Sequence, residues 1–433
     1  MRTVKKFPFS LNEDFKIRLL QWAQQFDEVV WMDSNHYSQK HETYQAILAV
    51  DAFTAIKTDT YSAFDNLKEY QTTTKDWVFG YLTYDLKNDV EKLSSNNFDG
   101  LGFPELYFFQ PKKVFLFFED SVEMHYLNMV ADEFETDWEA ILETPQKPDE
   151  GETSKAISIS LRTSKDSYIQ KVDQVLGHIG RGDIYEANIC QEFYSEGAEI
   201  IPFEIFRRLN EISKPPFSVF LKLNHLFALS ASPERYLKRT GNTVISQPIK
   251  GTAKRLKNKE EDLKMAQQLA ADPKERSENI MITDLVRNDL SRIAEKGSVT
   301  VDELCTIYTF EQVHQMISTV SCLVPQDFSS VEILRNTYPM GSMTGAPKIS
   351  AMRIIEDTED AKRGLYSGAI GYFTPSGDFD FNVVIRSILY NATKKYLSYS
   401  VGSAITINSL PEKEYEECLL KAKAMREVLN TEF

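Results

Sequence analysis

Three stretches in the carboxyl-terminal third of the chain decide the fold class: SGAIGYFT (367–374), FDFNVVIRSILY (379–390) and KYLSYSVGSAITI (395–407). Each is rich in β-branched and aromatic residues, and the turn PSGD separates the first two, so they predict adjacent antiparallel strands. Strand-like runs predominate elsewhere too, with helical segments between them and no regular βαβ alternation. We therefore expect an α+β fold with large, mainly antiparallel sheets.

The other elements follow from the same patterns. Apolar residues at helical spacing predict one helix over 164–182, ended by glycine, and another over 271–293. A final helix should run to about residue 430 from a capping box, Ser409 to Glu412, with proline inside its first turn. Further predicted strands are 28–34, 76–85, 112–120 and 184–194.

The chain divides at TPQKPDEGETSK (144–155), which has two prolines, one glycine and no large apolar residue. Such a composition indicates a linker or a surface excursion. We expect residues 1–143 to form an N-terminal subdomain and residues 156–433 to form the catalytic region.

Composition excludes several classes of protein. The 433 residues carry 49 basic and 64 acidic side chains, a net charge of −15, which argues against nucleic acid or anionic membrane as a partner. A small anionic substrate would need basic groups gathered at its site, because the long-range field repels it. The four cysteines show no CxxC spacing, and no run of about 18 apolar residues occurs, so we expect a cytoplasmic protein.

The loop YPMGSMTGAPK (338–348) precedes a predicted helix. It does not match a nucleotide-binding P-loop, because Ala346 and Pro347 separate Gly345 from Lys348. Two interpretations remain. The loop is a plain tight turn, or it leads into a helix N-terminus whose free amides bind a carboxylate as readily as a phosphate.

Two glutamates on predicted helices are candidate ligands for a hard cation. With six histidines and no paired-histidine motif, the chain does not predict a zinc or iron site. Glu278 shares a helix face with Ile282 and Leu285, which indicates that it points inward. Glu417 lies four residues before Lys421, so this pair is either a surface ion pair or part of a site.

Four further residues each have a structural and a functional interpretation. Glu234 follows a proline after an apolar run and is either a turn residue or a general acid. Arg386 lies in the predicted strand 379–390, where it covers an edge or binds an anion, and His314 is equally ambiguous. Lys250, in QPIKGTAKR, occupies a turn of small residues, which is an unusual place for a lysine.

Taken together, these stretches resemble the signatures of the chorismate-utilising enzymes, a family like component I of anthranilate synthase, and they occur in the family's order. More weakly, WMDSNH (31–36) and FGYLTYDL (79–86) resemble that family's first subdomain, so the resemblance covers nearly the whole chain. The matching motifs are GDIYEAN (182–188), SPERYL (232–237), PIKGT (248–252), ERSENIMITDLVRNDL (275–290), GSMTGAPK (341–348), RGLYSGAIGY (363–372), DFNVVIR (380–386) and EYEE (414–417).

The resemblance implies two large, mainly antiparallel sheets packed together with helices outside. PIKGT is most like the aminodeoxychorismate synthases, whose lysine at this place is a nucleophile, whereas anthranilate synthases carry alanine there. Isochorismate and salicylate synthases use a lysine where this chain has Glu186. The implied activity is amination of chorismate to 4-amino-4-deoxychorismate on the path to 4-aminobenzoate and folate, a transaminase-class transfer. The alternative is the reaction of anthranilate synthase component I.

The resemblance also implies roles for individual residues. Lys250 is the nucleophile, Glu234 is the general acid, and Glu278 and Glu417 hold Mg²⁺. The implied substrate-binding residues are Thr252, His314, Thr344, Gly345, Ala346, Tyr372, Arg386, Gly402, Ser403, Ala404 and Lys421.

Partners follow from the same resemblance. No cysteine lies in a GxCxG context, so a separate glutamine amidotransferase subunit would supply ammonia within a heterodimer. Some relatives hold tryptophan in the N-terminal subdomain, where Asp33 and Ser34 would line the pocket. Two features depart from the family: Ser403 and Ala404 occupy a turn that is usually glycine-rich, and Glu186 replaces the common glutamine. The sequence offers no account of Glu186.

Overall fold

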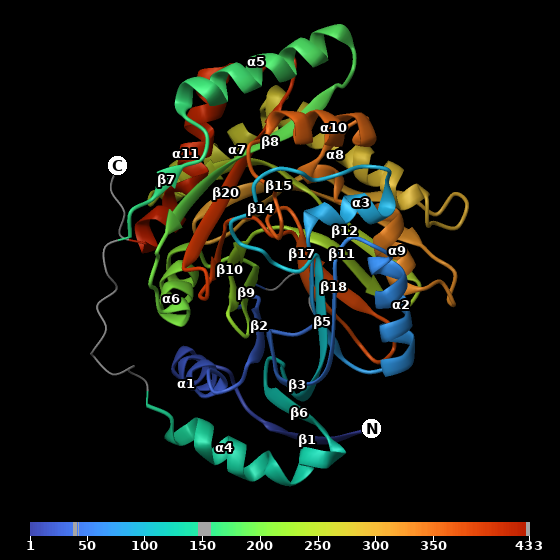
Figure 1. The fold of residues 1–433 in the computed structure, drawn as a ribbon, viewed down its shortest axis with the longest axis vertical. Helices are drawn as coiled ribbons and strands as arrows, with labels where there is room; N and C mark the ends of the chain where they lie inside the picture. Colours follow the sequence, from blue (N-terminus) through green and yellow to red (C-terminus); the bar gives the residue numbers. More distant parts are fainter. Residues whose placement is uncertain (38–40, 42, 146–156, 430–433) are drawn as a thin grey trace.

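Two antiparallel sheets that share strand β5 form the frame of the computed structural model, which describes residues 1–37, 41, 43–145 and 157–429 (Figure 1). Helices cover the outer faces and the ends of the sheets. The expected α+β fold of two packed, mainly antiparallel sheets is therefore confirmed. No helix among the described residues is long and apolar enough to cross a membrane.

The first sheet runs from the N-terminus to the strand that carries Glu186, with every neighbouring pair antiparallel. Two short strands, β7 (Ser160–Leu161) and β16 (Gly345–Ala346), pair with its last member. In spatial order the strands are β1 (Arg2–Pro8), β6 (Ser121–Leu127), β5 (Leu106–Phe117), β3 (Ala46–Thr58), β2 (Glu28–Asp33), β9 (Phe217–Leu223), β10 (Leu226–Ser232), β19 (Ser387–Asn391), β20 (Tyr396–Ile405) and β8 (Glu186–Glu196).

The second sheet begins on the other part of β5, and its strands are also antiparallel. Both β13 and β14 pair with β15, so the strand that carries Lys250 lies near the end of this sheet. In order the strands are β4 (Val78–Leu82), β17 (Ala369–Phe373), β18 (Phe379–Asn382), β11 (Arg235–Thr240), β12 (Thr243–Gln247), β15 (Val313–Leu323), β13 (Ile249–Lys254) and β14 (Thr300–Thr309).

Helices gather at opposite ends of the molecule, with α5, α7, α8, α10 and α11 at the top of Figure 1 and α1 and α4 at the bottom. The α-helices are α1 (Glu13–Ala23), α2 (Ala63–Thr74), α3 (Lys87–Val90), α4 (Phe134–Glu143), α5 (Lys165–Arg181), α6 (Pro202–Ser213), α7 (Lys259–Ala271), α8 (Pro273–Ser291), α9 (Ser330–Thr337), α10 (Lys348–Thr358) and α11 (Pro411–Val428). Short 3₁₀ turns cover Tyr84–Leu86, Asn128–Glu133 and Gly341–Met343.

Local sequence explains where the predicted helices begin and end. In α5 the Ser164 side chain accepts a hydrogen bond from the Ser167 amide, and Gly182 ends the helix in the left-handed region at φ 83°. The predicted capping box of the last helix is wrong. Leu410 is the N-cap of α11, and the Ser409 hydroxyl instead accepts from the Thr406 amide at 3.1 Å.

One predicted strand, 379–390, is broken in the structure. It forms β18 and β19, and Arg386 between them adopts a left-handed φ of 54°. β18 belongs to the second sheet and β19 to the first, so this segment crosses between sheets. The prediction failed because strand propensity is continuous across a position where the chain turns out of one sheet.

The N-terminal region and the catalytic region share both sheets. β2 pairs with β9, and β4 pairs with β17, so strands from before residue 143 are hydrogen-bonded to strands from after residue 156. The predicted linker lies outside the described residues from position 146 to its end.

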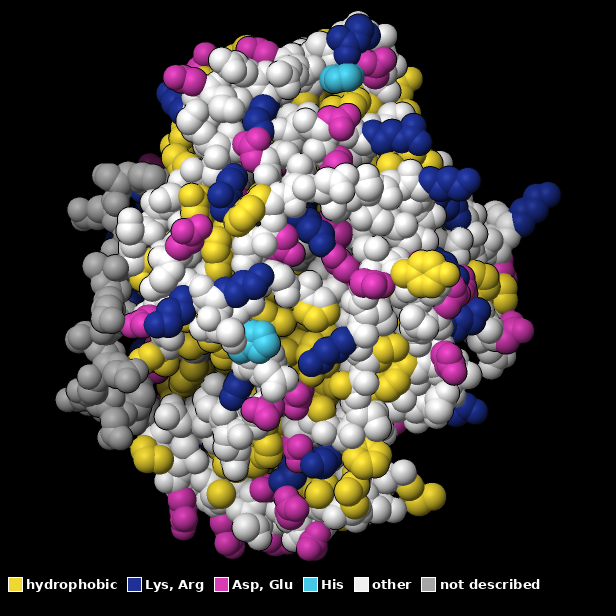
Figure 2. Space-filling view, viewed as in Figure 1, with side chains coloured by type: hydrophobic (Ala, Val, Ile, Leu, Met, Phe, Trp, Pro, Cys, Tyr) yellow, Lys and Arg dark blue, Asp and Glu magenta, His cyan; other side chains and the backbone are white. Residues whose placement is uncertain are grey.

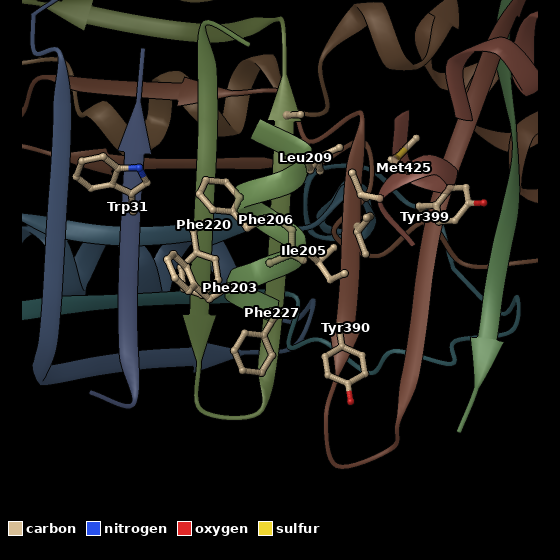
Figure 3. Packing of buried hydrophobic residues seen from close by; sticks show 14 of the residues in the cluster. Trp31, Phe203, Ile205, Phe206, Leu209, Phe220, Phe227, Tyr390, Tyr399 and Met425 are labelled. Atoms are coloured by element: carbon tan, nitrogen blue, oxygen red, sulfur yellow. The ribbon is translucent and has the colours of Figure 1, made fainter. Parts of the chain in front are cut away.

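The hydrophobic core has two layers because strand residues alternate between faces. Val219 and Leu221 on β9 belong to the layer between the two sheets, whereas Phe220 belongs to the layer beneath the helices. Figure 3 shows this second layer, where Phe203, Phe206 and Leu209 of α6 lie against the aromatic side chains of the strands. This packing involves side chains of β8, β10 and β20 and holds these strands in fixed positions.

Acidic side chains are unevenly distributed over the surface. Figure 2 shows them concentrated at the lower rim, where α4 lies, while basic and acidic side chains alternate over the centre of this face. On this face, the negative charge is therefore greatest at the lower rim.

Candidate active site

Lys250 on β13 lies beside Glu278 on α8. Its ammonium nitrogen is 3.6 Å from one oxygen of Glu278, and Lys274 is 3.7 Å from the other. The Asn279 side chain fixes α8 against the sheet by donating hydrogen bonds to the carbonyls of Lys250 (3.2 Å) and Met316 (3.0 Å). The lysine and the candidate metal ligand are thus held by one pair of elements.

Four carboxylates surround the Lys250 ammonium. Burial lowers its pKa, but the negative charges of Glu186, Glu278, Glu417 and Glu275 together raise it above the usual value. Glu417 comes from α11, at the other end of the sequence, and its pKa is lowered, since Lys421, Lys250 and Lys274 outweigh the opposing effect of burial. The structure therefore brings Lys250 together with both predicted metal ligands.

Glu234 lies on the same site, between β10 and β11. Burial raises the pKa of its carboxyl group to about 7, although a hydrogen bond from Ser342 and the charge of Lys250 act in the opposite direction. The Ser342 hydroxyl donates to Glu234 Oε1 at 2.7 Å. A carboxyl group with a pKa near neutrality is suited to act as a general acid.

The loop that contains Thr344, Gly345 and Ala346 runs antiparallel to the start of β8. Gly345 has φ 156°, and a Cβ atom there would lie 2.1 Å from the carbonyl oxygen of Glu186, so only glycine allows this close approach. The next residue in the chain after Ala346, Pro347, is the N-cap of α10 and provides no side-chain cap. The first amides of α10 are available to an anion, which favours the anion-binding interpretation of the loop over the plain turn.

Basic groups lie on the opposite side of the site. Arg386 donates to the carbonyl of Lys421 at 3.2 Å, and the Lys421 ammonium donates to the Gly402 carbonyl at 2.8 Å. Lys421 also pairs with Glu417 at 2.6 Å. Together with Thr252, these basic side chains line a cavity of about 340 Å³. Desolvation lowers the pKa of Arg386, partly offset by Tyr366 and Glu417.

Ser403 and Ala404 fit beside Gly402 without closing the site. The Ser403 hydroxyl donates to the carboxylate of Glu414 on α11, which turns this side chain toward the helix. A Cβ atom on Gly402 would lie 2.5 Å from Asn188 Oδ1, so a side chain there would require Asn188 to move. The departure from a glycine-rich turn is therefore accommodated by the position of α11.

Several buried polar atoms at the site have no hydrogen-bond partner. They are Glu186 Oε2, Asn188 Oδ1 next to Gly402, and Gln315 Oε1 on the cavity wall near Arg386. Unsatisfied buried polar groups are rare in folded proteins and carry a free-energy cost. These three oxygen atoms could accept hydrogen bonds from a polar ligand at the site.

His314 is the first predicted site residue that the structure does not bring to this site. Its ring bonds Asp262 on α7 through Nε2 at 3.0 Å and the Thr309 hydroxyl through Nδ1 at 2.9 Å. The neighbouring Gln315 points to the cavity, and alternation along β15 turns His314 to the other face. His314 therefore ties α7 to the sheet.

Tyr372 is the second predicted site residue that the structure places away from this site. It packs against Tyr44, Trp77 and Phe79 on the far side of the sheet, so the prediction that it binds the substrate requires correction. Tyr366, six residues earlier in the same motif, is the tyrosine whose charge acts on Arg386. The motif RGLYSGAIGY contains both tyrosines, and only the tertiary structure shows which one lies near Arg386.

The predicted tryptophan pocket is a separate cavity of about 70 Å³. Asp33 and Ser34 line it, together with Ser218 and Tyr372. The hydroxyls of Ser34 and Ser218 have no partner, and Asp33 pairs with the buried Lys16 at 2.8 Å. Residues of both the N-terminal region and the catalytic region thus line this pocket.

The residues fit a hard divalent cation. Within the described residues, no group of three or more His, Cys, Asp or Glu side chains is arranged to hold a metal ion. Glu278 and Glu417 are both close enough to Lys250 to raise its pKa, and Mg²⁺ commonly needs only one or two protein carboxylates besides substrate and water. The carboxylates around Lys250 outnumber the basic groups, so the site has a net negative charge that a divalent cation would offset.

Comparison with known proteins adds an independent observation. Residues 21–427 match the family model described as chorismate binding enzyme. The chain is 31% identical to aminodeoxychorismate synthase component 1 of Bacillus subtilis, over 81% of this chain and 76% of that protein. It is 34% identical to anthranilate synthase component 1 of Thermus thermophilus, over 80% of this chain and 76% of that protein.

A shorter match has a higher identity. It reaches 41% with aminodeoxychorismate synthase of Streptomyces griseus, over 64% of this chain, but the match spans only 38% of that longer protein. In structure, anthranilate synthase component I of Streptococcus pneumoniae superposes with a TM-score of 0.77 and 24% identity, covering 90% of this chain and 95% of that one. This likeness shows the fold.

Proposed function

Because the chain belongs to the chorismate-binding enzyme family, we propose that it converts chorismate and ammonia to 4-amino-4-deoxychorismate. The observation that carries this proposal is the placement of Lys250, which lies 3.6 Å from Glu278 and acts electrostatically on Glu234. A lysine at this point supplies the nucleophile that this reaction needs and that the anthranilate synthase reaction does not use.

The proposed reaction has two displacements. The surrounding carboxylates raise the pKa of Lys250, so its ammonium must first lose a proton. The resulting amine forms a bond to C2 of the ring as the C4–O bond breaks, and Glu234 donates its proton to the departing oxygen, which leaves as water. Ammonia then forms a bond to C4 as the C2–N bond to Lys250 breaks. The lysine is released as an amine, and the new amino group replaces the C4 hydroxyl.

Basic groups and backbone amides would orient chorismate, which is a dianion. We assign the enolpyruvyl carboxylate to Arg386 with Tyr366, beside the backbone of Gly402, and the ring carboxylate to the amides of residues 344–346 and the start of α10. Lys421 stabilises the part of the site that would bind the enolpyruvyl carboxylate, because its ammonium donates a hydrogen bond to the Gly402 carbonyl (2.8 Å).

Glu278 and Glu417 would hold Mg²⁺. Bound there, the ion would supply positive charge beside the ring carboxylate and draw electrons from the ring. Glu278 is also the partner of Lys250, and Glu417 is the partner of Lys421, so these two carboxylates connect the lysine with the basic side of the site.

Ammonia would come from a glutamine amidotransferase subunit or from free ammonium. The printed name of the Bacillus subtilis relative, component 1, supports a two-subunit enzyme. We propose a heterodimer in which this chain carries the chorismate chemistry of 4-aminobenzoate synthesis.

One assay tests the proposal. Purified protein is mixed with chorismate, Mg²⁺ and ammonium, and the products are resolved by chromatography and mass, beside a Lys250→Ala variant. We expect aminodeoxychorismate from the wild type and none from the variant. Release of pyruvate with formation of anthranilate would instead support the second candidate, which the Thermus thermophilus relative favours by its name.

The N-terminal pocket supports a separate proposal, the binding of tryptophan. Its unpartnered hydroxyls, Ser34 and Ser218, and the Asp33 carboxylate are suited to the amino and carboxylate groups of an amino acid. Calorimetric titration with tryptophan tests this proposal. Binding that is lost in Ser218→Ala supports it, and absence of heat with the wild type contradicts it.

A further inference from the structure

Glu186 is a buried carboxylate that the proposed reaction does not yet use. It is only 2% exposed, it begins β8, and its Oε2 atom has no hydrogen-bond partner. Its backbone pairs with Ala346, so the residue is fixed to the loop assigned to the ring carboxylate. The residue therefore borders the place where the ring would lie.

The surroundings of Glu186 define the charge of its ligand. Burial raises the pKa of its carboxyl group, Lys250 lowers it and Glu278 raises it further. A carboxylate repels the dianionic substrate, so Glu186 is unsuited to bind chorismate directly. The unpartnered oxygen is an acceptor that points to a cationic or hydrogen-bond-donating ligand.

We propose that Glu186 binds the ammonium ion that is the second substrate and accepts its proton. This inference rests on the proposed amination of chorismate, in which ammonium is the small cation that must reach the ring. At neutral pH ammonia is mostly present as the ammonium ion. Ammonium has no lone pair and cannot attack carbon until it loses a proton. The site therefore needs a base, and Glu186 is a buried carboxylate with an unpartnered acceptor atom.

The step balances without a further reactant. Ammonium transfers one proton to the Glu186 carboxylate, giving ammonia and a neutral carboxylic acid. The nitrogen lone pair then forms the bond to C4, the double bonds of the ring shift back toward C2, and the C2–N bond to Lys250 breaks with its electron pair leaving on the lysine nitrogen. Glu186 is set back to its ionised form when it releases the proton to solvent after the product leaves.

This role separates Glu186 from a glutamine at the same position. A glutamine side chain can accept a hydrogen bond from ammonium but cannot take its proton. A chain with glutamate should therefore use free ammonium more efficiently than its own Glu186→Gln variant, whereas ammonia delivered already neutral should be used equally well. Glu186→Gln should therefore differ from the wild type in its use of ammonium and not in its binding of chorismate.

Steady-state kinetics with ammonium chloride test the proposal. In Glu186→Gln, which preserves the size of the side chain, we expect the KM for ammonium to rise at least tenfold and the KM for chorismate to stay within twofold. Glu186→Asp, which keeps a carboxylate, should recover part of the loss. If the two KM values rise together, or if neither changes, Glu186 is a structural residue and the proposal is wrong.

A neutral nucleophile separates proton transfer from general damage to the site. Hydroxylamine carries no extra proton at neutral pH, so the rate of Glu186→Gln with hydroxylamine should match that of the wild type. An equal loss with both nucleophiles would overturn the proton-accepting role. If the wild type consumes no chorismate in the presence of ammonium, the proposed function itself fails, and this outcome is visible before any variant is compared.

Discussion

The ammonium group of Lys250 lies 3.6 Å from a carboxylate oxygen of Glu278, although 27 other residues separate them in the chain. β13 supplies the lysine and α8 supplies the glutamate, and the Asn279 side chain holds the two elements together. In the proposed reaction, this relationship holds the nucleophile next to a carboxylate that would bind the cation.

Replacing Lys250 should remove amination while sparing the fold. In Lys250→Ala we expect kcat to fall by about a thousandfold or more, because a covalent nucleophile has no substitute. Lys274→Ala is the matched control, since Lys274 also lies near Glu278, at 3.7 Å, but is half exposed. Product formation by chromatography measures both. A similar loss in the control would show that Lys250 acts only through charge.

The pH dependence of turnover should report Glu234. Its carboxyl group has a pKa of about 7 and must be protonated to donate, so kcat/KM should fall above neutral pH. The Ser342 hydroxyl stabilises the ionised form, so Ser342→Ala should raise this pKa and move the falling limb to higher pH. A limb that moves to lower pH would contradict the assignment of Glu234 as the acid.

The same carboxyl group should lower stability at alkaline pH. Its pKa is raised from 4.5 to about 7 in the folded protein, so ionisation costs up to about 3 kcal/mol once the pH exceeds both values. Below pH 4.5 the acid is protonated in both states, and the effect disappears. Glu234→Gln should therefore raise Tm relative to wild type at pH 8 but not at pH 4, as thermal unfolding would show. A gain of equal size at both pH values would be inconsistent with this origin.

Two tyrosines of one motif should behave differently. Tyr366→Phe should raise the KM for chorismate about tenfold, because its hydroxyl lies on the side of Arg386. Tyr372→Phe should leave that KM unchanged, since Tyr372 lines the N-terminal pocket. The reverse result would restore Tyr372 as the substrate-binding residue.

Removal of divalent cations should stop turnover. We expect EDTA to abolish product formation and added Mg²⁺ to restore it, with a higher Mg²⁺ requirement in Glu278→Gln and Glu417→Gln. Glu416→Gln is the matched control, because Glu416 is the exposed neighbour of Glu417 on α11. Full activity in EDTA would refute the assignment of these glutamates as metal ligands.

Motifs with fixed local chemistry could be placed from the sequence. Glu234, Lys250, Glu278 and Glu417 were proposed as one constellation, and the structure brings the three glutamates around Lys250. One loop, residues 344–346, lies against β8. The loop can approach this strand closely because residue 345 is glycine. These residues are local signatures whose partners are supplied by neighbouring motifs.

Residues whose role depends on facing direction could not be placed. Strand alternation turns His314, the neighbour of Gln315 on β15, to α7, and sheet pairing turns Tyr372 to the N-terminal pocket. The side chains that lie at the site are Gln315, one residue after His314, and Tyr366, six residues before Tyr372. No local pattern in the sequence distinguishes these neighbours.

The sequence by itself determined the family, the antiparallel α+β fold and the chemical types of the site residues, because motifs and alternating apolar residues are written locally in the chain. Only the tertiary structure decided that 379–390 crosses between sheets, that Tyr366 and not Tyr372 borders Arg386, and that Glu186 is left with an unpartnered oxygen. The physical reason is that burial, facing direction and the charge around a group arise from elements far apart in sequence.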